Sequence, residues 1–330
     1  MDTFLQQVVN GLTLGAIYAV VALGYTMVYG IIQLINFAHG AVVMIGAMVA
    51  FTVINALHGS GLPPVLILAA GTAAAVPACM LVGYAMERIA YRPLRNAPRL
   101  AALITAIGVS FILQYAALLI WSRNVLAFPQ IVESRRFEYL GASITSMQIL
   151  IVLVCFAMMG GLAVLVYRTR LGTAMRAAAQ NQQVAGLMGI DVNRVIASTF
   201  VIGAGLAAVA GVMFGSYYGV AQYTMGSILG LKAFAAAVLG GIGNIPGAML
   251  GGVLLGLLEA LGAGYIGDLT DLCRWPLVSS SGPLAGRCAD GGHFILFGSN
   301  YQDVFAFIVL ILVLVLRPSG LLGERVGDRA

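Results

Sequence analysis

The sequence predicts an all-α fold, a polytopic bundle of membrane-spanning helices. Of the 330 residues, 61% are hydrophobic and only 9% are charged, whereas soluble globular domains average about 45–50% apolar and about 25% charged residues. The mean hydropathy is +0.98. Lipid must therefore replace water around most of the chain. At roughly 20 residues per span plus loops, a chain of this length holds about eight to ten spans.

Long apolar stretches separated by charged segments define the spans. The stretch from 228 to 263 is too long for one span and is broken at Gly243, Asn244, Pro246 and Gly247, so we divide it into two. Residues 28 to 40 are either a break inside one crossing unit or a plain loop. The sequence therefore predicts nine spans in a single transmembrane domain over residues 1–330. The apolar stretches are 5 to 35, 37 to 57, 62 to 86, 100 to 121, 147 to 167, 195 to 220, the two parts of 228 to 263, and 302 to 316.

The arginines predict the orientation, because short loops rich in Lys and Arg stay on the cytoplasmic side. Two loops are basic, from Glu87 to Arg99 and from Arg168 to Arg194. Counting spans from them places the N-terminus and the 264–300 loop in the periplasm and the C-terminus in the cytoplasm of a bacterial inner membrane. No Lys or Arg precedes the first apolar run, so we expect that run to be retained as a span.

The formal charge of +5 does not predict nucleic-acid binding, because the basic residues do not gather on one exposed face. Lipid is the expected surrounding instead. The three histidines are scattered, which gives no metal-ligand spacing.

The four cysteines fall in two environments. Cys79 and Cys155 lie within apolar spans and read as small buried hydrophobes. Cys273 and Cys288 lie in the polar 264–300 loop, where an oxidising compartment favours a disulfide. Closing a loop of about 15 residues would stabilise the fold by about 3 kcal/mol. Two free thiols are the alternative.

Sequence motifs for catalysis or nucleotide binding are absent. The single lysine, Lys232, follows Leu231 rather than the glycine of a phosphate-binding loop, so we expect no cofactor bound by this chain. No serine lies in a Gly-x-Ser-x-Gly elbow. The intramembrane ionisable candidates reduce to Lys232, Glu259 and Glu87. We expect Lys232 to snorkel to the headgroups and Glu259 to snorkel or to pair between helices. We therefore expect that the chain is not an enzyme. The scarcity of ionisable groups within the spans also disfavours a carrier driven by protons or sodium ions.

Two related interruptions break the apolar pattern, at Asn36 to Ala41 and at Asn244 to Ala248. Pro and Gly release backbone N–H and C=O groups from helical hydrogen bonds. In a bilayer such groups are tolerated only where protein buries them or where they line a water-filled cavity. Paired interruptions in two halves of a chain favour a translocation pathway between them. The alternative is a pair of tight turns capped by the two asparagines, and both interpretations can hold together. The predicted pathway residues are Asn36, His39, Gly40, Asn244, Pro246 and Gly247, with a structural hydrogen bond as the alternative for His39.

The 168–194 loop differs from every other loop. Residues 173 to 188 are rich in strong helix formers, and Gly189 suits a helix end. The spacing of its apolar residues indicates a short amphipathic helix outside the membrane. Such a helix docks into a partner's groove or rests on lipid.

Four motifs in order resemble the permeases of branched-chain amino-acid ABC importers. They are Asn36-Phe37-Ala38-His39-Gly40, the segment from Arg176 to Ile190, the glycine-rich run from Gly240 to Ala248, and the tail from Arg317 to Gly323. The resemblance covers nearly the whole chain. It implies a second homologous permease subunit, two cytoplasmic ATPase subunits that bind the ATP, and a periplasmic substrate-binding protein.

The resemblance also identifies the 168–194 loop as a coupling helix that docks on an ATPase. Its expected coupling residues are Arg176, Ala179, Gln180, Asn181, Gly186 and Gly189. Two features depart from the family pattern. Position 181 is Asn where many relatives carry an acidic residue, and the segment from 268 to 297 is longer than is usual in the family.

The function that the resemblance implies is ATP-driven import of branched-chain or related hydrophobic amino acids. ATP binding would close the ATPases, and the coupling helix would shift the helices around Asn36 and Asn244. Permeases for urea or short amides share the Asn-x-Ala-His-Gly element and are one alternative. A secondary carrier that works without ATP is another.

Overall fold

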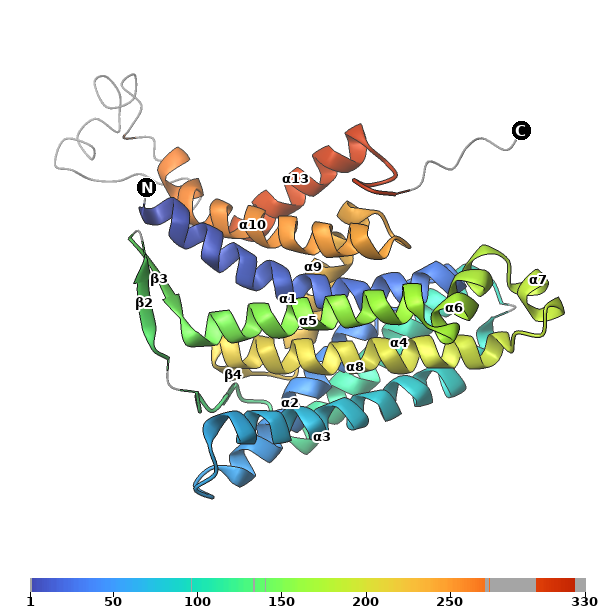
Figure 1. Ribbon diagram of the computed structural model, residues 1–330, viewed down its shortest axis with the longest axis horizontal. Coiled ribbons are helices and arrows are strands. Elements are labelled where there is room, and N and C mark those ends of the chain that lie inside the picture. Colours follow the sequence, from blue (N-terminus) through green and yellow to red (C-terminus); the bar gives the residue numbers. More distant parts are fainter. Residues whose placement is uncertain are drawn as a thin grey trace.

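The computed structural model describes residues 2–95, 97–132, 134–139, 141–270, 273 and 301–323, and it is almost entirely helical. The elements in chain order are α1 (Asp2–Ile32), α2 (His39–Leu57), α3 (Pro64–Ala85), the π-helix η1 (Met86–Tyr91), the 3-10 helix η2 (Arg92–Leu94), α4 (Arg99–Ile120), β1 (Leu126–Ala127), β2 (Arg136–Tyr139), β3 (Ala142–Thr145), α5 (Ser146–Arg168), α6 (Arg170–Gln180), α7 (Gln182–Leu187), α8 (Val192–Tyr218), β4 (Val220–Ala221), α9 (Met225–Gly240), α10 (Ile245–Leu269) and α13 (Gln302–Leu316) (Figure 1).

The predicted bundle of membrane spans is confirmed. Seven described helices are long and apolar enough to cross a bilayer, and α9 and α13 are shorter apolar helices. Each lies within a few residues of a predicted stretch, including the division of 228 to 263 into α9 and α10. The break after α1 is an irregular segment of six residues, from 33 to 38, so α1 and α2 are separate helices.

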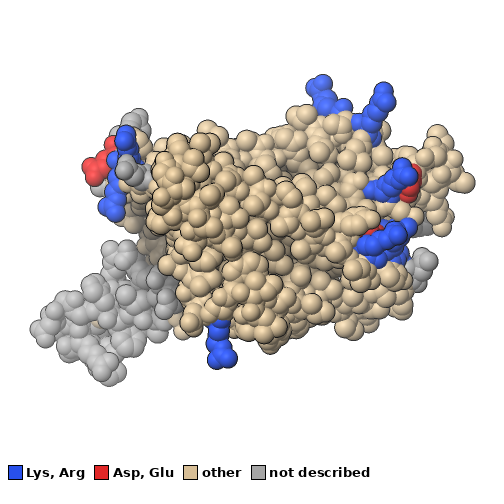
Figure 2. Space-filling view, turned by 90° about the horizontal axis from the view of Figure 1, so that it is seen from below, with Lys and Arg blue, Asp and Glu red and all other residues tan. Residues whose placement is uncertain are grey.

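The bundle has two distinct ends. One end, called the arginine-rich end below, carries η1, η2, α6 and α7, and the opposite end carries the start of α1 and the β2–β3 hairpin (Figure 1). Arg317 lines the same cavity as Arg176 of α6. On the face shown in Figure 2, most Lys and Arg side chains lie towards the two ends, and the broad surface between them is uncharged except for one basic side chain at the lower edge of the view. This distribution is what a bilayer around the middle of the bundle requires.

Helix α1 forms the centre of the bundle and packs against α10, α8, α5 and α9. Its contact with α10 depends on glycine. A Cβ atom on Gly15 would lie 2.7 Å from the Cα of Val253, and one on Gly256 would lie 2.2 Å from the backbone nitrogen of Gly15. Because lipid gives helices no hydrophobic drive to associate, such close backbone approach supplies the packing energy instead.

Short strands close the end of the bundle opposite α6 and α7. β1 pairs antiparallel with β4, so that Leu126 faces Ala221, and β2 pairs antiparallel with β3. The Gln6 amide of α1 joins the hairpin by donating to the Ser143 carbonyl at 3.1 Å and accepting from its amide at 2.8 Å. The hairpin is therefore fixed to the start of the central helix.

The cysteines divide as the sequence predicts in the described part of the chain. Cys79 and Cys155 are buried free thiols. Cys273 is disulfide-bonded. Cys288 lies outside the described residues, so the Cys273–Cys288 pairing stays a prediction.

Replacing Gly256 by alanine is expected to destabilise the fold, because the added methyl group meets backbone atoms of Gly15 that cannot move aside. Overpacking of this kind costs about 1–3 kcal/mol. The matched control is Gly160→Ala on α5, where nothing lies within 4 Å of the new Cβ. Thermal unfolding of the two purified variants measures the difference. Equal melting temperatures would contradict the close contact between α1 and α10.

Candidate translocation and coupling site

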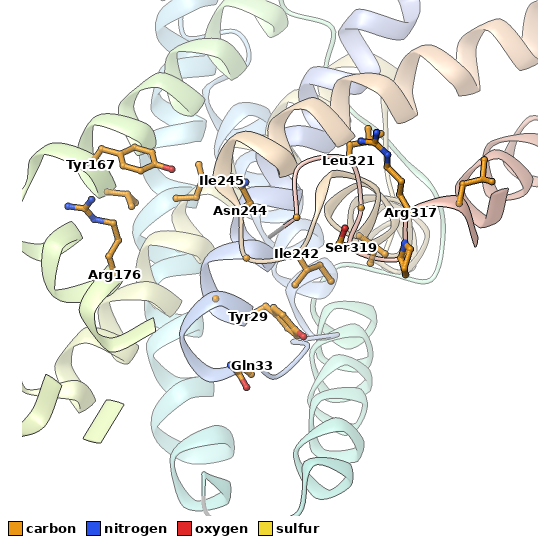
Figure 3. A pocket seen from close by; sticks show the side chains of 18 residues that line it. Tyr29, Gln33, Tyr167, Arg176, Ile242, Asn244, Ile245, Arg317, Ser319 and Leu321 are labelled. Carbon is orange, nitrogen blue, oxygen red and sulfur yellow. The ribbon is translucent and has the colours of Figure 1, made fainter. Parts of the chain in front are cut away.

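A cavity of about 1330 Å³ opens at the arginine-rich end of the bundle. It is larger than the about 300–1,000 Å³ typical of small-molecule pockets, so it suits a vestibule better than a fitted site. Figure 3 shows Tyr167 and Arg176 on one side, Arg317 and Ser319 on the other, and Asn244 between them. The lining residues are Tyr29, Gly30, Gln33, Val166, Tyr167, Arg176, Val238, Ile242–Ile245, Leu316–Leu321 and Gly323.

The turn between α9 and α10 forms one wall of this cavity. Gly241 and Gly243 adopt φ values of +103° and +96°, which L side chains rarely adopt. Asn244 caps α10 by accepting from the Gly247 amide at 3.4 Å, and Pro246 occupies the first turn, where no amide is needed. Asn244 is thus both a helix cap and a cavity residue. Its assignment to the translocation pathway, with that of Pro246 and Gly247, stays a prediction.

The C-terminal tail closes over the same turn. The Leu321 amide donates to the Leu239 carbonyl at 2.9 Å, and the Leu322 amide donates to the Gly240 carbonyl at 3.0 Å. The Asn244 side-chain amide donates to the Leu322 carbonyl at 2.7 Å. The last carbonyls of a helix have no partner within the helix. The tail therefore supplies the hydrogen-bond donors that the last carbonyls of α9 lack within the helix.

The first interruption lies elsewhere, in the core. Asn36 is buried, and its Oδ1 accepts from the Ala38 amide at 3.1 Å and from the Tyr91 hydroxyl at 2.7 Å. It therefore stabilises the turn before α2, although the residue at the N-cap position is Ala38, which makes no side-chain cap bond. None of Asn36, His39 and Gly40 lines the cavity.

His39 and Gly40 are packing residues in this conformation. The His39 ring meets the Tyr25 ring edge-on at 4.9 Å, and it fits only because position 24 is glycine, whose Cβ would lie 2.2 Å from Nε2. A Cβ on Gly40 would lie 2.2 Å from the Gly226 carbonyl oxygen, so Gly40 brings α2 against α9. Their assignment to the translocation pathway stays a prediction.

The end of α1 connects the two interruptions. Tyr29, Gly30 and Gln33 line the cavity three to seven residues before Asn36. A Cβ on Gly30 would lie 3.8 Å from the Cα of Gly243. The sequence reasoning missed these residues because Gln33 stands alone among apolar neighbours, and its unusual φ of +56° is visible only in the structure.

The predicted coupling loop, residues 168–194 and called the coupling segment below, contains two helices, α6 and α7. The predicted single helix over 173 to 188 is therefore wrong. α6 ends at Gln180, and Asn181 caps α7 by accepting from the amides of Gln183 and Val184, both at 3.0 Å. An asparagine side chain that bonds the following amides competes with helix continuation. Gly189, at φ +85°, follows α7 as predicted.

The coupling segment presents different residues to the bundle and to its surroundings. Met175, Ala178 and Ala185 are buried, whereas Leu187 and Met188 are 87% and 79% exposed. Arg176 lines the cavity, with its guanidinium 5.7 Å from the centre of the Tyr167 ring. Of the other predicted coupling residues, Gln180, Asn181, Gly186 and Gly189 are exposed and Ala179 is half-buried.

Side-chain hydrogen bonds attach the coupling segment to the spans. Gln182 Nε2 donates to the Ile31 carbonyl at 2.7 Å, at the end of α1. Arg95 donates both to Asn193, at the start of α8, and to the buried carboxylate of Glu87. Glu87 lies in the π-helix η1, which is an uncommon conformation often found at functional sites.

Ionisable side chains also meet inside the bundle. Lys232 Nζ lies 2.7 Å from Glu259 Oε1 and 2.8 Å from Asp303 Oδ1, and the Tyr18 hydroxyl donates to Glu259 Oε2 at 3.0 Å. The Lys232 side chain is only 12% exposed, so the expected snorkelling of Lys232 is wrong. Glu259 is an interhelical partner, and Asp303 was not among the predicted ionisable groups because it begins the last apolar stretch.

The family of the chain follows from comparison with known proteins. The model for the permease component of branched-chain amino acid transport systems matches residues 7–314. The chain belongs to this family. It is 47% identical to BraD, named as a high-affinity branched-chain amino acid transport system permease protein of Pseudomonas aeruginosa, over 97% of this chain and 96% of that protein.

Two further proteins to which this permease is similar are also named as branched-chain amino acid transport permeases. It is 46% identical to the Escherichia coli protein LivH, also named as a high-affinity branched-chain amino acid transport system permease protein, over 97% of this chain and 96% of the relative. A probable branched-chain amino acid transport permease of Methanocaldococcus jannaschii is 29% identical, over 58% of this chain and 59% of that protein. No solved structure matches the chain. The permease is a transport component and not an enzyme, as the sequence predicted.

Asn244→Ala is expected to release the tail, because it removes the bond to the Leu322 carbonyl and the cap of α10. Loss of about 1 kcal/mol from one hydrogen bond corresponds to about fivefold faster amide exchange at Leu321 and Leu322. Asn244→Asp keeps the cap acceptor and loses only the donor to Leu322. Hydrogen exchange with mass spectrometry should show the tail loosened in both variants and the start of α10 loosened in Asn244→Ala alone. Unchanged exchange in both would contradict the clamp.

Proposed function

We propose that this permease is a membrane subunit of an ATP-driven importer that moves branched-chain amino acids inward across the bacterial inner membrane. The observation that carries the proposal is near-full-length identity of 46–47% with proteins named as high-affinity branched-chain amino acid permeases. The proposed assembly contains this chain, a second homologous permease subunit, two cytoplasmic ATPase subunits and a periplasmic substrate-binding protein. ATP binds to the ATPases, and this chain binds no cofactor.

The proposed orientation has the arginine-rich end in the cytoplasm. It rests on the retention of short arginine-rich loops on that side. The N-terminus and the β2–β3 hairpin are then periplasmic, and the hairpin forms part of the surface available to the binding protein. The cavity beside Asn244 is a cytoplasmic vestibule in this orientation.

The ATPase docking surface that we propose is the apolar tip of the coupling segment, Leu187 and Met188. Large apolar side chains with exposed fractions of 87% and 79% suit a hydrophobic groove on a partner. Membrane lipid is the other possible surrounding for the tip. A carrier working without ATPases would leave the tip without a protein partner, and the relatives' printed names do not favour a urea or amide substrate.

The proposed mechanism is alternating access driven through the coupling segment. ATP binding closes the two ATPases and displaces α6 and α7. The Gln182 bond to Ile31 transmits the displacement to the end of α1. Arg95 transmits it from Asn193 to Glu87 in η1, and the Tyr91 hydroxyl of η1 transmits it to Asn36. Movement of these helix ends, together with the α9–α10 turn at Asn244, opens the pathway outward, and hydrolysis resets it.

The docking surface is tested by the double substitution Leu187→Asp/Met188→Asp. Two carboxylates cannot be buried in a hydrophobic groove, so the ATPases should be lost from the complex when this chain is purified by affinity tag and its partners are identified by mass spectrometry. The matched control, Leu187→Met/Met188→Leu, keeps the surface apolar and should retain them. Retention of the ATPases by the charged variant would place docking elsewhere, and recovery of the chain alone in mild detergents would favour a self-sufficient carrier.

Gln182→Ala tests transmission to α1. Loss of one hydrogen bond of about 1 kcal/mol should lower amino-acid uptake per ATP hydrolysed about fivefold, with ATP hydrolysis retained. The control is Gln183→Ala, the adjacent exposed residue. Reconstituted complexes in liposomes provide both rates. Equal coupling ratios in the two variants would exclude the Gln182–Ile31 contact from the mechanism.

A further inference from the structure

The proposed substrate poses an electrostatic problem that the bundle must solve. A branched-chain amino acid at neutral pH is a zwitterion, with an ammonium and a carboxylate on the same carbon. Moving unpaired charges out of water costs several kcal/mol per ion even after the protein relaxes. A pathway through the bundle therefore has to offer charges of both signs where water is excluded.

Within the described spans, charges of both signs converge at one place away from the ends. Lys232 of α9 lies within ion-pair distance of Glu259 of α10 and Asp303 of α13, at 2.7 Å and 2.8 Å. The Tyr18 hydroxyl of α1 and the Gln302 amide of α13 donate to Glu259 at 3.0 Å and 3.5 Å. Lys232 is the only lysine in the sequence. We call these five residues the charge cluster.

The charge cluster lies deep in the bundle. Tyr18 is near the midpoint of α1, which runs from Asp2 to Ile32. Glu259 is fourteen residues from the start of α10 at Ile245, which is about 21 Å along a helix. A hydrocarbon core is about 30 Å thick. The other end of α10, at Leu269, is ten residues or about 15 Å from Glu259. Glu259 therefore lies in the middle part of its helix, and an ionisable group within a span is by default a functional candidate.

The two short helices of the bundle meet at the charge cluster. α9 has 16 residues and α13 has 15, and Asp303 lies in the first turn of α13. Substrate sites in transporters commonly lie near the bilayer midplane where shortened or broken helices end. The start of α13 thus brings a helix N-terminus and a carboxylate to the same depth as Tyr18 and Glu259.

The charges of the cluster match a zwitterion. One ammonium and two carboxylates give it a net charge of −1, so the cluster has a carboxylate to spare for a second ammonium. Glu259 is 1% exposed, whereas the Asp303 side chain is 42% exposed, which makes Asp303 the accessible member.

We propose that the charge cluster holds the backbone charges of the amino-acid substrate during translocation. The substrate ammonium binds between the Glu259 and Asp303 carboxylates, and the substrate carboxylate binds the Lys232 ammonium. In the structure described here the protein's own charges satisfy one another. Substrate entry exchanges each internal ion pair for a pair of the same kind, so no charge is left buried alone. This inference rests on the proposed function.

A structural ion pair that only holds α13 against α9 and α10 is the competing explanation, and it makes a different prediction. Replacing a buried ion pair with well-packed neutral residues of similar volume is often neutral or stabilising. A cluster with a purely structural role therefore tolerates neutralisation, whereas a binding site for a zwitterion does not.

The test uses the complete importer in liposomes, with leucine as substrate and the binding protein present. The variant Lys232→Met/Glu259→Gln/Asp303→Asn removes all three charges and keeps an acceptor for Tyr18. We expect leucine uptake to fall at least tenfold, equivalent to about 1.4 kcal/mol, with ATP hydrolysis and thermal stability retained. The single variant Lys232→Arg keeps the cation and both carboxylates. It should therefore retain part of the leucine uptake that the neutral variant loses.

Leucine uptake by the neutral variant at the wild-type rate would overturn the site and leave the proposed function intact. If the neutral variant does not assemble, Asp303→Asn decides, because it leaves the Lys232–Glu259 pair in place. Reduced uptake with retained ATP hydrolysis supports the site, and unchanged uptake overturns it. A wild-type complex without leucine uptake would overturn the proposed function itself, and the site with it.

Discussion

The close packing of α1 against α10 is the contact on which the rest of the structure depends. In a bilayer, every buried backbone group must find its partner within the protein, and helices associate by fitting their surfaces together. Gly15 and Gly256 allow the two backbones to meet where any side chain would separate them. This contact fixes the direction of α10, and hence the places of the Asn244 turn at one end of α10 and of Glu259 in its middle.

The requirement that backbone groups find hydrogen-bond partners within the protein also explains the contacts at the arginine-rich end. The tail donates to the carbonyls of Leu239 and Gly240 at the end of α9, Asn244 joins the tail to the start of α10, and Gln182 donates to the Ile31 carbonyl near the end of α1. Three helix ends are therefore held by contacts that a modest displacement can break and remake. The proposed alternating access requires movable helix ends of this kind, because a packed core resists deformation.

Much of this arrangement could be predicted from the sequence, because hydropathy and charge report directly on lipid contact. The spans, their limits and the division at Gly243–Gly247 follow from apolar runs and helix-breaking residues. The asparagines at the two interruptions have different environments, because Asn36 bonds Tyr91 within the core and Asn244 lies on the cavity. Their similar local patterns contain no information on tertiary contacts, so the pattern alone treated them alike.

Two predictions failed because local sequence patterns contain no information on tertiary contacts. Lys232 was expected at the headgroups, because its partners Glu259 and Asp303 are 27 and 71 residues away in the sequence. Asn181 was placed inside one helix, because helix propensity summed over its neighbours outweighed the capping that its side chain provides. In both cases a specific polar contact overrides an average tendency, and such contacts occur where the bundle holds a charge or changes direction.

The central claim, that this permease completes an ATP-driven importer of branched-chain amino acids, is tested most directly by leucine uptake into liposomes. The complex contains this chain, its homologous permease, the two ATPases and the binding protein. ATP-dependent accumulation of leucine that stops when this chain alone is omitted is the predicted result. Leucine uptake by this chain without the ATPases, or equal uptake with and without ATP, would contradict the claim.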